Sequence, residues 1–304
     1  MSEGPRLAVV IVSYETSDTL LEGLAALERG TGLAVETLVV DNASTDGSAG
    51  AVRARFPEVR VIANTENVGF SRACNQGARA TRAPFVLFLN PDTTLAPDTL
   101  RTLVAIVEKH PRVGIVGPRT RSSNGDIQVS TGADLSLVSE WRQRRLVRGV
   151  AARDPRALAE AEACHAVDHE PGWVSGACLL ARREALDAVS GFDERFFLYE
   201  EDADLCRRVR AAGFKVLFTA DVEVRHAKGR SMARAPERAR LEYHRSHLLY
   251  YRKHCDPLQR AALRLLLGAR AAGDWGAGAV SGDSARRREA GTLLRLALAG
   301  RSAT

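Results

Sequence analysis

One stretch of the sequence, residues 85–94, constrains the fold more than any other. Its first five residues, Phe85–Leu89, are all apolar, which is typical of a strand that is buried on both faces. Pro91 cannot donate to a strand ladder and disfavours a helix at Asn90, so the strand ends there. Asp92 is therefore predicted at the carboxyl end of a buried strand, where ligands bind in open α/β sheets. The alternative is that Asp92 forms a turn and caps the following helix.

Strand and helix patterns alternate through residues 1–118. The expected strands are Leu7–Val12, Glu36–Val40, Val59–Ala63, Phe85–Leu89 and Val113–Pro118, with helices expected around 20–27, 49–55, 72–80 and 97–110. This alternation predicts right-handed β-α-β crossovers and a mostly parallel sheet flanked by helices. The first strand is not followed by the glycine patterns of a dinucleotide-binding turn or a P-loop, so neither of those phosphate sites is expected.

The pattern changes after residue 118. Only irregular structure with one or two short helices is expected between residues 119 and 171. A buried strand and a short helix are then expected before Gly191. The acidic cluster 200–204 opens another helix, where the helix dipole favours negative charge with or without a catalytic role. Residues 215–226 are consistent with a hairpin or two short strands ending at His226, and the tail from residue 236 is expected to be helical.

Composition excludes several classes of protein. The chain has 304 residues, a formal net charge of +6 and a pI near 9.3, which favour anionic partners without choosing among them. The five cysteines are widely spaced without a Cys-x-x-Cys pair, so neither a disulfide framework nor a zinc site is indicated. Without a signal-peptide pattern or an apolar run of spanning length, we expect a cytoplasmic protein. The basic residues are dispersed and form no nucleic-acid-binding motif, so nucleic acid is not an expected partner.

Several motifs in combination resemble the family 2 glycosyltransferases of the GT-A fold, in particular the bacterial rhamnosyltransferases. The motifs are Val-Ser-Tyr at 12–14, Val-Asp-Asn-Ala-Ser-Thr-Asp-Gly-Ser at 40–48, Asn-Val-Gly-Phe at 67–70 with Asn75, Asn-Pro-Asp at 90–92, Gly-Trp-Val-Ser-Gly at 172–176 and Phe-Phe-Leu-Tyr-Glu-Glu-Asp-Ala-Asp-Leu-Cys-Arg at 196–207. The resemblance runs from residue 7 to about 231. It implies a GT-A domain over residues 1–235, with a nucleotide-binding half of about 1–118 and an acceptor and catalytic half of about 119–235. A helical extension of residues 236–304 follows.

The resemblance also implies a set of site residues. Asp41 corresponds to the residue that contacts the donor's pyrimidine base, Asn90 lies near the ribose, and Asp92 binds a divalent metal with His226 as a second contact. The implied donor-binding residues are Ser13, Tyr14, Glu15, Asp41, Asn67, Gly69, Phe70, Asn75, Asn90 and Asp92. Trp173, Ser175 and Gly176 are implied to contact the acceptor.

The catalytic pair is implied to be Glu201 and Asp202, with Asp202 as the base. Two positions depart from the family pattern. Glu15 stands where asparagine is commoner, and the additional acid Glu200 makes the register of the pair ambiguous by one residue. Tyr199 and the residues after the cluster favour Asp202.

The chemistry of glycosyl transfer requires the same residue types. A divalent cation stabilises the charge on a nucleotide diphosphate leaving group, and a histidine ligand favours Mn²⁺ over Mg²⁺. A carboxylate accepts the proton of the attacking hydroxyl group, and attack from the face opposite the leaving group inverts the anomeric centre. We therefore expect a nucleotide-sugar donor, most specifically dTDP-L-rhamnose, and a glycan or lipid-linked acceptor.

Two other functions are compatible with the architecture. A sugar-phosphate nucleotidyltransferase would need a glycine-rich, arginine-containing loop after the first strand, and Ser13-Tyr14-Glu15 does not provide one. A non-catalytic nucleotide-sugar-binding assembly partner remains as the alternative. The basic, Tyr- and Leu-rich segment Arg238–Arg270 is expected either to lie against an anionic membrane, at the inner face of the cell membrane, or to pack as a helical cap.

Overall fold

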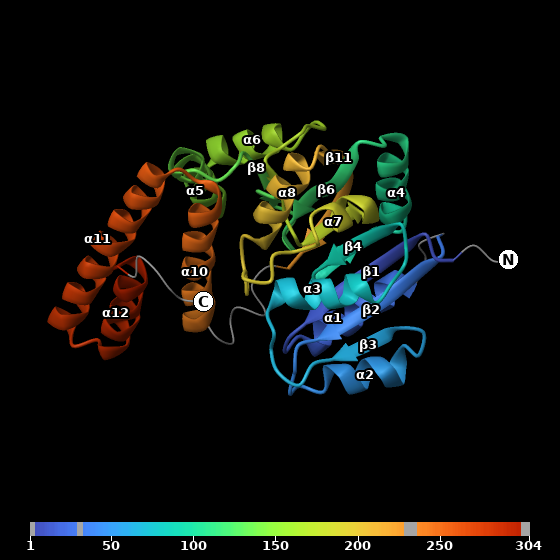
Figure 1. Ribbon diagram of the computed structural model, residues 1–304, viewed down its shortest axis with the longest axis horizontal. Coiled ribbons are helices and arrows are strands. Elements are labelled where there is room, and N and C mark those ends of the chain that lie inside the picture. Colours follow the sequence, from blue (N-terminus) through green and yellow to red (C-terminus); the bar gives the residue numbers. More distant parts are fainter. Residues whose placement is uncertain (1–3, 29–32, 228–235, 299–304) are drawn as a thin grey trace.

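Nine strands form one central sheet among the residues that the computed structural model describes, which are 4–28, 33–227 and 236–298 (Figure 1). Along the sheet the main strands follow the order β3-β2-β1-β4-β10-β6-β11-β5. They are β1 (Leu7–Ser13), β2 (Val35–Asp41), β3 (Arg60–Ala63), β4 (Phe85–Leu89), β5 (Thr93–Leu95), β6 (Val113–Arg121), β10 (Cys178–Arg182) and β11 (Lys215–His226). The short strand β7 (Ile127–Gln128) pairs with β6, and β8 (Thr131–Gly132) pairs with β9 (Trp173–Val174) in a separate sheet.

The first four long strands are parallel, as the alternating pattern predicts. Helices α1 (Ser17–Glu28), α2 (Ser48–Arg55), α3 (Phe70–Arg79) and α4 (Thr99–Lys109) lie in the connections. All residues of β1 and β4 are buried. Alternate residues of β1 join two different hydrophobic clusters, one on each face of the sheet. The apolar runs in the sequence are therefore explained by burial on both faces.

The second half of the sheet is mixed. Strand β10 lies antiparallel between β4 and β6, whereas β6 and β11 are parallel. The predicted hairpin or pair of strands at 215–226 is one strand, β11, in which the pairing with β6 shifts between Thr219 and Glu223. This irregularity accommodates Ala220 and Asp221, which interrupt the apolar pattern.

The segment 119–171 contains more helix than the sequence predicted. Helix α5 (Leu137–Ala151) begins with a capping box made by Ser136 and Ser139, and α6 (Pro155–Cys164) has Asp154 as its cap. Both starts carry ordinary capping residues. The alanine, arginine and glutamate content of the segment is that of exposed helices, which have little apolar periodicity.

The C-terminal helices are α10 (Pro236–His254), α11 (Pro257–Ser281) and α12 (Ser284–Leu298). Helices α11 and α12 pack on each other at one end of the molecule, whereas α10 lies between them and the sheet-containing part (Figure 1). Tyr250 and Tyr251 of α10 are almost fully buried in the same cluster as the sheet. The predicted domain boundary after residue 235 adjoins 228–235, which lie outside the described residues. No helix in the described part of the chain combines the length and apolarity needed to cross a bilayer.

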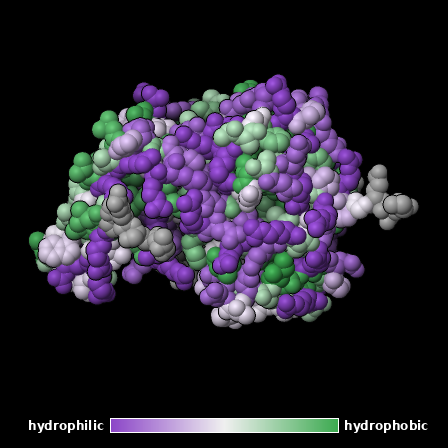
Figure 2. Space-filling model, in the orientation of Figure 1, coloured by the Kyte–Doolittle hydropathy of each residue, from purple (hydrophilic) through white to green (hydrophobic). Residues whose placement is uncertain are grey.

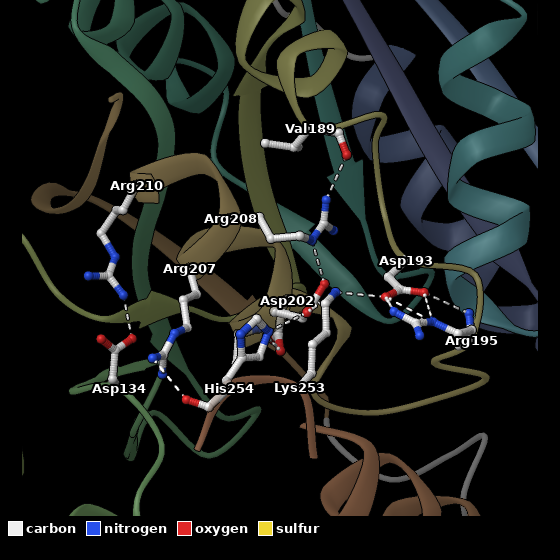
Figure 3. A network of polar contacts seen from close by, with 12 residues as sticks. Asp134, Val189, Asp193, Arg195, Asp202, Arg207, Arg208, Arg210, Lys253 and His254 are labelled. Carbon is white, nitrogen blue, oxygen red and sulfur yellow. Dashed lines mark hydrogen bonds and ion pairs between the residues drawn. The ribbon is translucent and has the colours of Figure 1, made fainter. Parts of the chain in front are cut away.

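After α7 (Arg183–Ala188), the chain continues to α8 (Glu201–Ala211). A buried polar network joins α8 to α10. The fully buried Asp204 contacts Arg208, Lys253 and His254 at 2.7, 2.6 and 2.6 Å. Figure 3 shows both α10 side chains approaching α8. Burial acts to raise the pKa of Asp204, but the hydrogen bond from His254 and the charge of Arg208 outweigh it and hold the pKa below the ordinary value.

Candidate active site

A cavity of about 820 Å³ opens where β1, β2, β4 and β11 end. Sixteen of its lining residues come from four regions: the donor-side loops (Tyr14, Asn42, Asn67, Phe70), the β4 end with His226 (Asn90, Asp92, His226), the acceptor and acid segments (Trp173, Ser175, Gly176, Glu200, Glu201, Asp202) and α10 (Arg238, Glu242, Tyr243). Four regions of the chain therefore meet in one cleft at the carboxyl ends of the parallel strands, the expected place for a ligand.

Asp92 and His226 lie side by side in this cleft. Asp92 Oδ1 is 3.1 Å from His226 Nε2, and their side chains are 8% and 12% exposed. Their proximity follows from the pairing of β5 with β11, which sets His226 opposite Thr93, the neighbour of Asp92. Gln128, which sequence reasoning missed, donates to the His226 carbonyl at 2.8 Å and lies 3.3 Å from Nδ1 of the same ring. Helix α4 has Asp98 at its N-cap, so Asp92 is not the cap of that helix.

Glu201 and Asp202 occupy the first turn of α8 and both line the cleft. Asp202 accepts hydrogen bonds from the amides of Gly176 and Ala203, each at 2.8 Å. Glu201 is 7% exposed, and no group in the described residues hydrogen-bonds to its Oε2. The two acids therefore differ in their hydrogen bonding, because only Asp202 has both of its carboxylate oxygens bonded by backbone amides.

Burial raises the pKa of both carboxyl groups. The effect is largest at Glu201, whose pKa the charge of Asp202 raises further, to well above the ordinary value. At Asp202 burial is also the main cause, and the two amide hydrogen bonds oppose it. A carboxylate with a raised pKa is a stronger base when it is ionised, so Asp202 has the properties that a general base needs.

The loop before α8 has an unusual backbone. Tyr199 and Glu200 both have left-handed conformations, with φ values of 72° and 62°. For residues other than glycine, this region costs roughly 1–2 kcal/mol per residue, so neighbouring contacts must hold the loop. Its Phe197 carbonyl accepts a hydrogen bond from Phe70 N at 2.7 Å, which ties the acid loop to the donor motif.

The donor-side residues surround the ends of β1 and β2. Tyr14, Asn67 and Phe70 line the cleft, and Gly69 has a φ of +88° next to Phe197. Asp41 is 3% exposed, with Oδ2 accepting from Ser44 N at 3.1 Å and Oδ1 without a hydrogen-bond partner in the described residues.

Five of the predicted donor-site residues are not among those that line the cleft: Ser13, Glu15, Asp41, Gly69 and Asn75. Asn75 bonds the backbone of Phe192: its amide oxygen accepts from Phe192 N and its amide nitrogen donates to Phe192 O, both at 2.9 Å. Ser13 is fully buried and its hydroxyl lies 3.0 Å from that of Thr16. Glu15 accepts from Thr45 N at 2.6 Å and so supports the loop after β2. The Asp46 carboxylate accepts hydrogen bonds from Ser17 N and Ser48 N, at the starts of α1 and α2.

The predicted acceptor residues lie together. Trp173, Ser175 and Gly176 line the cleft beside Asp202, and Trp173 is 9% exposed. A further part of the lining was not predicted. It consists of side chains from α5 and α10, namely Glu140, Gln143, Arg144, Val147, Arg148, Arg238, Glu242 and Tyr243. Neither helix carries a recognisable motif, and the two meet only through the fold.

Comparisons with known proteins agree with this geometry. The model of the family described as "Glycosyltransferase like family 2" matches residues 5–242. An N-acetylglucosaminyl-diphospho-decaprenol L-rhamnosyltransferase of Mycobacterium tuberculosis is 33% identical over 273 residues, which cover 86% of this chain and 89% of the relative.

The chain belongs to the family 2 glycosyltransferases. Its fold resembles those of solved GT-A glycosyltransferases. A mannosyltransferase from Pyrobaculum calidifontis, solved with GDP-Man and Mn²⁺, aligns with a TM-score of 0.58 and 20% identity over 99% of this chain and 77% of its own. S. aureus TarS residues 1–349 align with a TM-score of 0.53 and 16% identity over 86% of this chain and 69% of their own. These likenesses confirm the predicted GT-A fold, and the family membership makes the protein a glycosyltransferase.

Replacing Gly69 by alanine is expected to weaken nucleotide binding by this glycosyltransferase. A Cβ there would lie 2.8 Å from the carbonyl oxygen of Phe197, and the φ of +88° adds strain. We expect the dissociation constant for dTDP, measured by calorimetry, to rise about tenfold or more, because this clash and strain cost more than about 1.4 kcal/mol. Gly47→Ala is the matched control. Gly47 has a φ of +82° with nothing near its Cβ position, so this variant should lose stability without losing dTDP affinity. Equal losses of affinity would contradict the role of the Gly69–Phe197 contact.

Proposed function

We propose that the protein is an inverting rhamnosyltransferase, which moves L-rhamnose from dTDP-L-rhamnose to a hydroxyl group of a glycan or lipid-linked glycan. The observation that carries this proposal is the single cleft in which Asp202 faces the same space as Asp92 and His226. The choice of sugar is supported by the near full-length similarity to a relative that is named as an L-rhamnosyltransferase.

On the donor side, the free Oδ1 of Asp41 supports a contact with an N–H group of the pyrimidine base. A buried carboxylate oxygen without a partner is costly unless a ligand satisfies it. Asn90 extends from the end of β4 into the same cleft, in the position proposed for the ribose contact. Phe70 and Tyr14 offer aromatic surface nearby.

The residues present fit a divalent metal that a nucleotide diphosphate helps to hold. Among the described residues no cluster of three or more His, Cys, Asp and Glu side chains could bind a metal by itself. Asp92 and His226 offer one oxygen and one nitrogen from nearly buried positions, a donor set that suits Mn²⁺. Bound there, the ion would stabilise the negative charge of the leaving diphosphate.

On the acceptor side, Asp202 is the proposed base. Its carboxylate takes the proton of the acceptor hydroxyl as the hydroxyl oxygen bonds to the anomeric carbon. The bond between that carbon and the diphosphate oxygen breaks, and the nucleotide diphosphate leaves with the bonding electrons. Attack from the opposite face inverts the anomeric centre without a covalent enzyme intermediate. Trp173, Ser175 and Gly176 are the proposed acceptor contacts, because they border Asp202.

The second candidate is transfer from another nucleotide sugar. A screen of donors decides between the two. L-rhamnose lacks a 6-hydroxyl group, and a site fitted to its methyl group would leave such a hydroxyl unpaired, at about 1–3 kcal/mol. We therefore expect kcat/KM for dTDP-L-rhamnose to exceed that for UDP-glucose and UDP-galactose by roughly 5- to 150-fold.

The uracil and thymine forms of the nucleotide should both bind, since one methyl group in an apolar pocket is worth only about 1–3 kcal/mol. Faster turnover of UDP-glucose or UDP-galactose would remove the rhamnosyl assignment and leave the glycosyltransferase assignment intact. Binding of every donor without turnover of any would favour the non-catalytic assembly partner.

A membrane surface is the proposed peripheral partner, and α11 is the helix that supports it. Leu258, Leu265, Leu266 and Val280 of this helix are 79%, 74%, 59% and 92% exposed. Figure 2 shows hydrophobic side chains gathered along the end of the molecule that α11 forms. Arginines at 260, 264 and 270 flank them. A helix with an exposed apolar stripe, flanked by basic residues, suits the interface of an anionic bilayer. The α10 part of the predicted membrane segment packs instead in the core.

A double variant, Leu265→Glu with Leu266→Glu, is expected to lower the affinity for vesicles that contain anionic lipid about tenfold or more, because two apolar side chains no longer enter the interface. Co-sedimentation measures the bound fraction. Val167→Glu is the control, because Val167 is 65% exposed and lies outside the C-terminal helices. Unchanged vesicle binding of the double variant, or a wild-type dimer in solution that the substitutions dissociate, would show that the stripe does not contact lipid.

A further inference from the structure

Helix α10 holds the loop before the catalytic acids at three consecutive residues. Ser246 Oγ donates a hydrogen bond to the Leu198 carbonyl at 2.7 Å. The ring of Tyr243 packs edge-on against Tyr199, with centroids 5.8 Å apart. His247 Nδ1 lies 2.6 Å from the Glu200 carboxylate. Each residue from 198 to 200 therefore has its own contact with α10.

His247 is the most deeply enclosed of these contacts. Its side chain is 1% exposed, and it lies between two carboxylates from different elements. Besides the contact with Glu200, its Nε2 lies 3.3 Å from Oε2 of Glu140 on α5, an ion-pair distance without hydrogen-bond alignment. Tyr243 stacks on the imidazole at 5.5 Å with an interplanar angle of 14°. An imidazole between two carboxylates is best accommodated when both of its nitrogens carry protons.

The other charged and titratable groups around His247 belong to α5 and α10. On α5, Glu140 is also bonded by Arg144 at 2.9 Å and accepts from Tyr251 of α10 at 2.5 Å. Arg144 in turn bonds the hydroxyl group of Tyr243 at 3.1 Å. His244, one turn before His247 on α10, has its pKa lowered to about 4, mainly by burial, so it is neutral at neutral pH. The two carboxylates are thus opposed by the half-exposed guanidinium of Arg144 and the buried imidazole of His247.

We propose that His247 is a positioning residue for the glycosyl transfer reaction. By binding Glu200, it holds the left-handed residues Tyr199 and Glu200 in place and thereby fixes where α8 begins and where Asp202 points. Glu200 is the N-cap residue of α8, and Asp202 follows two residues later. The proposal rests on the function proposed for Asp202. It also gives Glu200 a supporting role, because its carboxylate faces α10.

No sequence motif identifies this residue. The family model ends at residue 242, so His247 lies beyond the part of the chain that it matches. Although α10 was predicted as a separate extension, in this protein the helix completes the cleft and holds the loop that carries the acids.

The contact between His247 and Glu200 should weaken, and kcat should fall, as pH rises. Burial acts to lower the pKa of His247, but the charge and hydrogen bond of Glu200 outweigh it and raise the pKa above the ordinary value. The protonated form is therefore the one that the fold favours, and the contact weakens as pH rises through that raised pKa. We expect kcat to fall on the alkaline side for this reason, in addition to an acid limb set by Asp202.

The experiment compares two substitutions of His247 in the full-length protein. His247→Leu removes both nitrogens and should lower kcat about 10- to 100-fold, since a small displacement of a catalytic group costs this much. Its affinity for dTDP should stay within about threefold of wild type, because the base-binding side is not altered. In His247→Asn the side-chain amide takes the place of Nδ1, so most of kcat should return at neutral pH. This variant should also lack the alkaline limb, because asparagine does not titrate.

His254→Leu is the matched control, because His254 joins the same two helices through Asp204 rather than through Glu200. It should lower the melting temperature and leave the shape of the pH profile of kcat unchanged. The proposal is wrong if folded His247→Leu keeps wild-type kcat, or if His247→Asn retains the alkaline limb. The test is independent of the donor assignment, because any donor that turns over reports kcat. If Asp202→Asn is active and His247→Leu is not, then the proposal that Asp202 is the base is the one that is wrong.

Discussion

Replacing Asp202 by asparagine is expected to lower kcat by about 10²-fold or more, because asparagine cannot accept the proton of the attacking hydroxyl group. Asp202 is held in place by the amides of Gly176 and Ala203, and the donor-side residues lie on other elements. The dissociation constant for dTDP should therefore change little, which separates loss of the base from loss of binding. Steady-state kinetics with a glycan acceptor and calorimetry with dTDP measure the two effects.

The pH profile provides a second readout of the same group. Since burial raises the pKa of Asp202, the acid limb of kcat should lie above the ordinary aspartate pKa near 3.9. The base acts only when it is ionised, so kcat should rise with pH through this raised pKa. Residual activity of Asp202→Asn should lack that limb.

The neighbouring acids serve as controls. Burial and the charge of Asp202 raise the pKa of Glu201 well above its ordinary value, which favours the neutral form, and Glu201→Gln should therefore retain most of kcat. Gln resembles a protonated Glu in shape and hydrogen bonding. Glu200→Gln should show an intermediate loss, because it weakens the contact with His247. If either glutamine variant is the inactive one while Asp202→Asn turns over normally, the base has been assigned to the wrong acid.

The sequence predicted those parts of the fold that depend on local patterns. Uninterrupted apolar runs identified β1 and β4, because strands buried on both faces lack alternation. It did not predict that β10 would be antiparallel, because strand direction is set by the path of the whole chain. It also predicted a break within 215–226, whereas pairing with β6 along most of its length keeps β11 continuous.

For the site, the sequence predicted residues that lie at element ends and missed those that lie mid-helix. Asp92 and Asp202 each stand where an element ends or begins, and a carboxylate there is visible in the sequence. Asn75 does not line the cleft, and a polar residue within α3 gives no sign in the sequence of which way it faces. Glu140 and His247 meet across 107 residues, and only the packing of α5 against α10 brings them together. Contacts between residues so far apart in the chain leave no periodic pattern in the sequence.

The two halves of the site are held in place by different parts of the fold. Asp92 and His226 are set by the pairing of β5 and β11 in the sheet, a rigid support for the donor. The acids depend on a loop with a left-handed backbone, which α10 braces from outside the sheet. A variant of the sheet half should therefore impair donor-linked steps, whereas a variant of the loop half should impair proton transfer.

Replacing Asp92 by alanine, or chelating metal with EDTA, is expected to abolish transfer, with a loss of about 10²-fold or more in kcat/KM. Asp92 would contribute an anionic oxygen to a cation that balances the leaving diphosphate, and such charge stabilisation is worth several kcal/mol. Activity lost to EDTA should return with Mn²⁺ in the wild type and not in Asp92→Ala. Electron paramagnetic resonance of Mn²⁺ in the presence of dTDP measures the same binding without turnover, and the bound signal should be lost in the variant.

Asp98→Ala is the matched control for this carboxylate. Asp98 lies six residues further along the chain, its side chain is 78% exposed, and it makes no side-chain capping bond to α4. Its removal should change neither Mn²⁺ binding nor transfer. Substitution of His226 by alanine should weaken Mn²⁺ binding less than Asp92→Ala, because a neutral imidazole contributes less charge than a carboxylate. Full transfer by Asp92→Ala in EDTA would instead mean that the diphosphate leaves without a cation, and that the arginines lining the cleft, Arg144, Arg148 and Arg238, neutralise its charge.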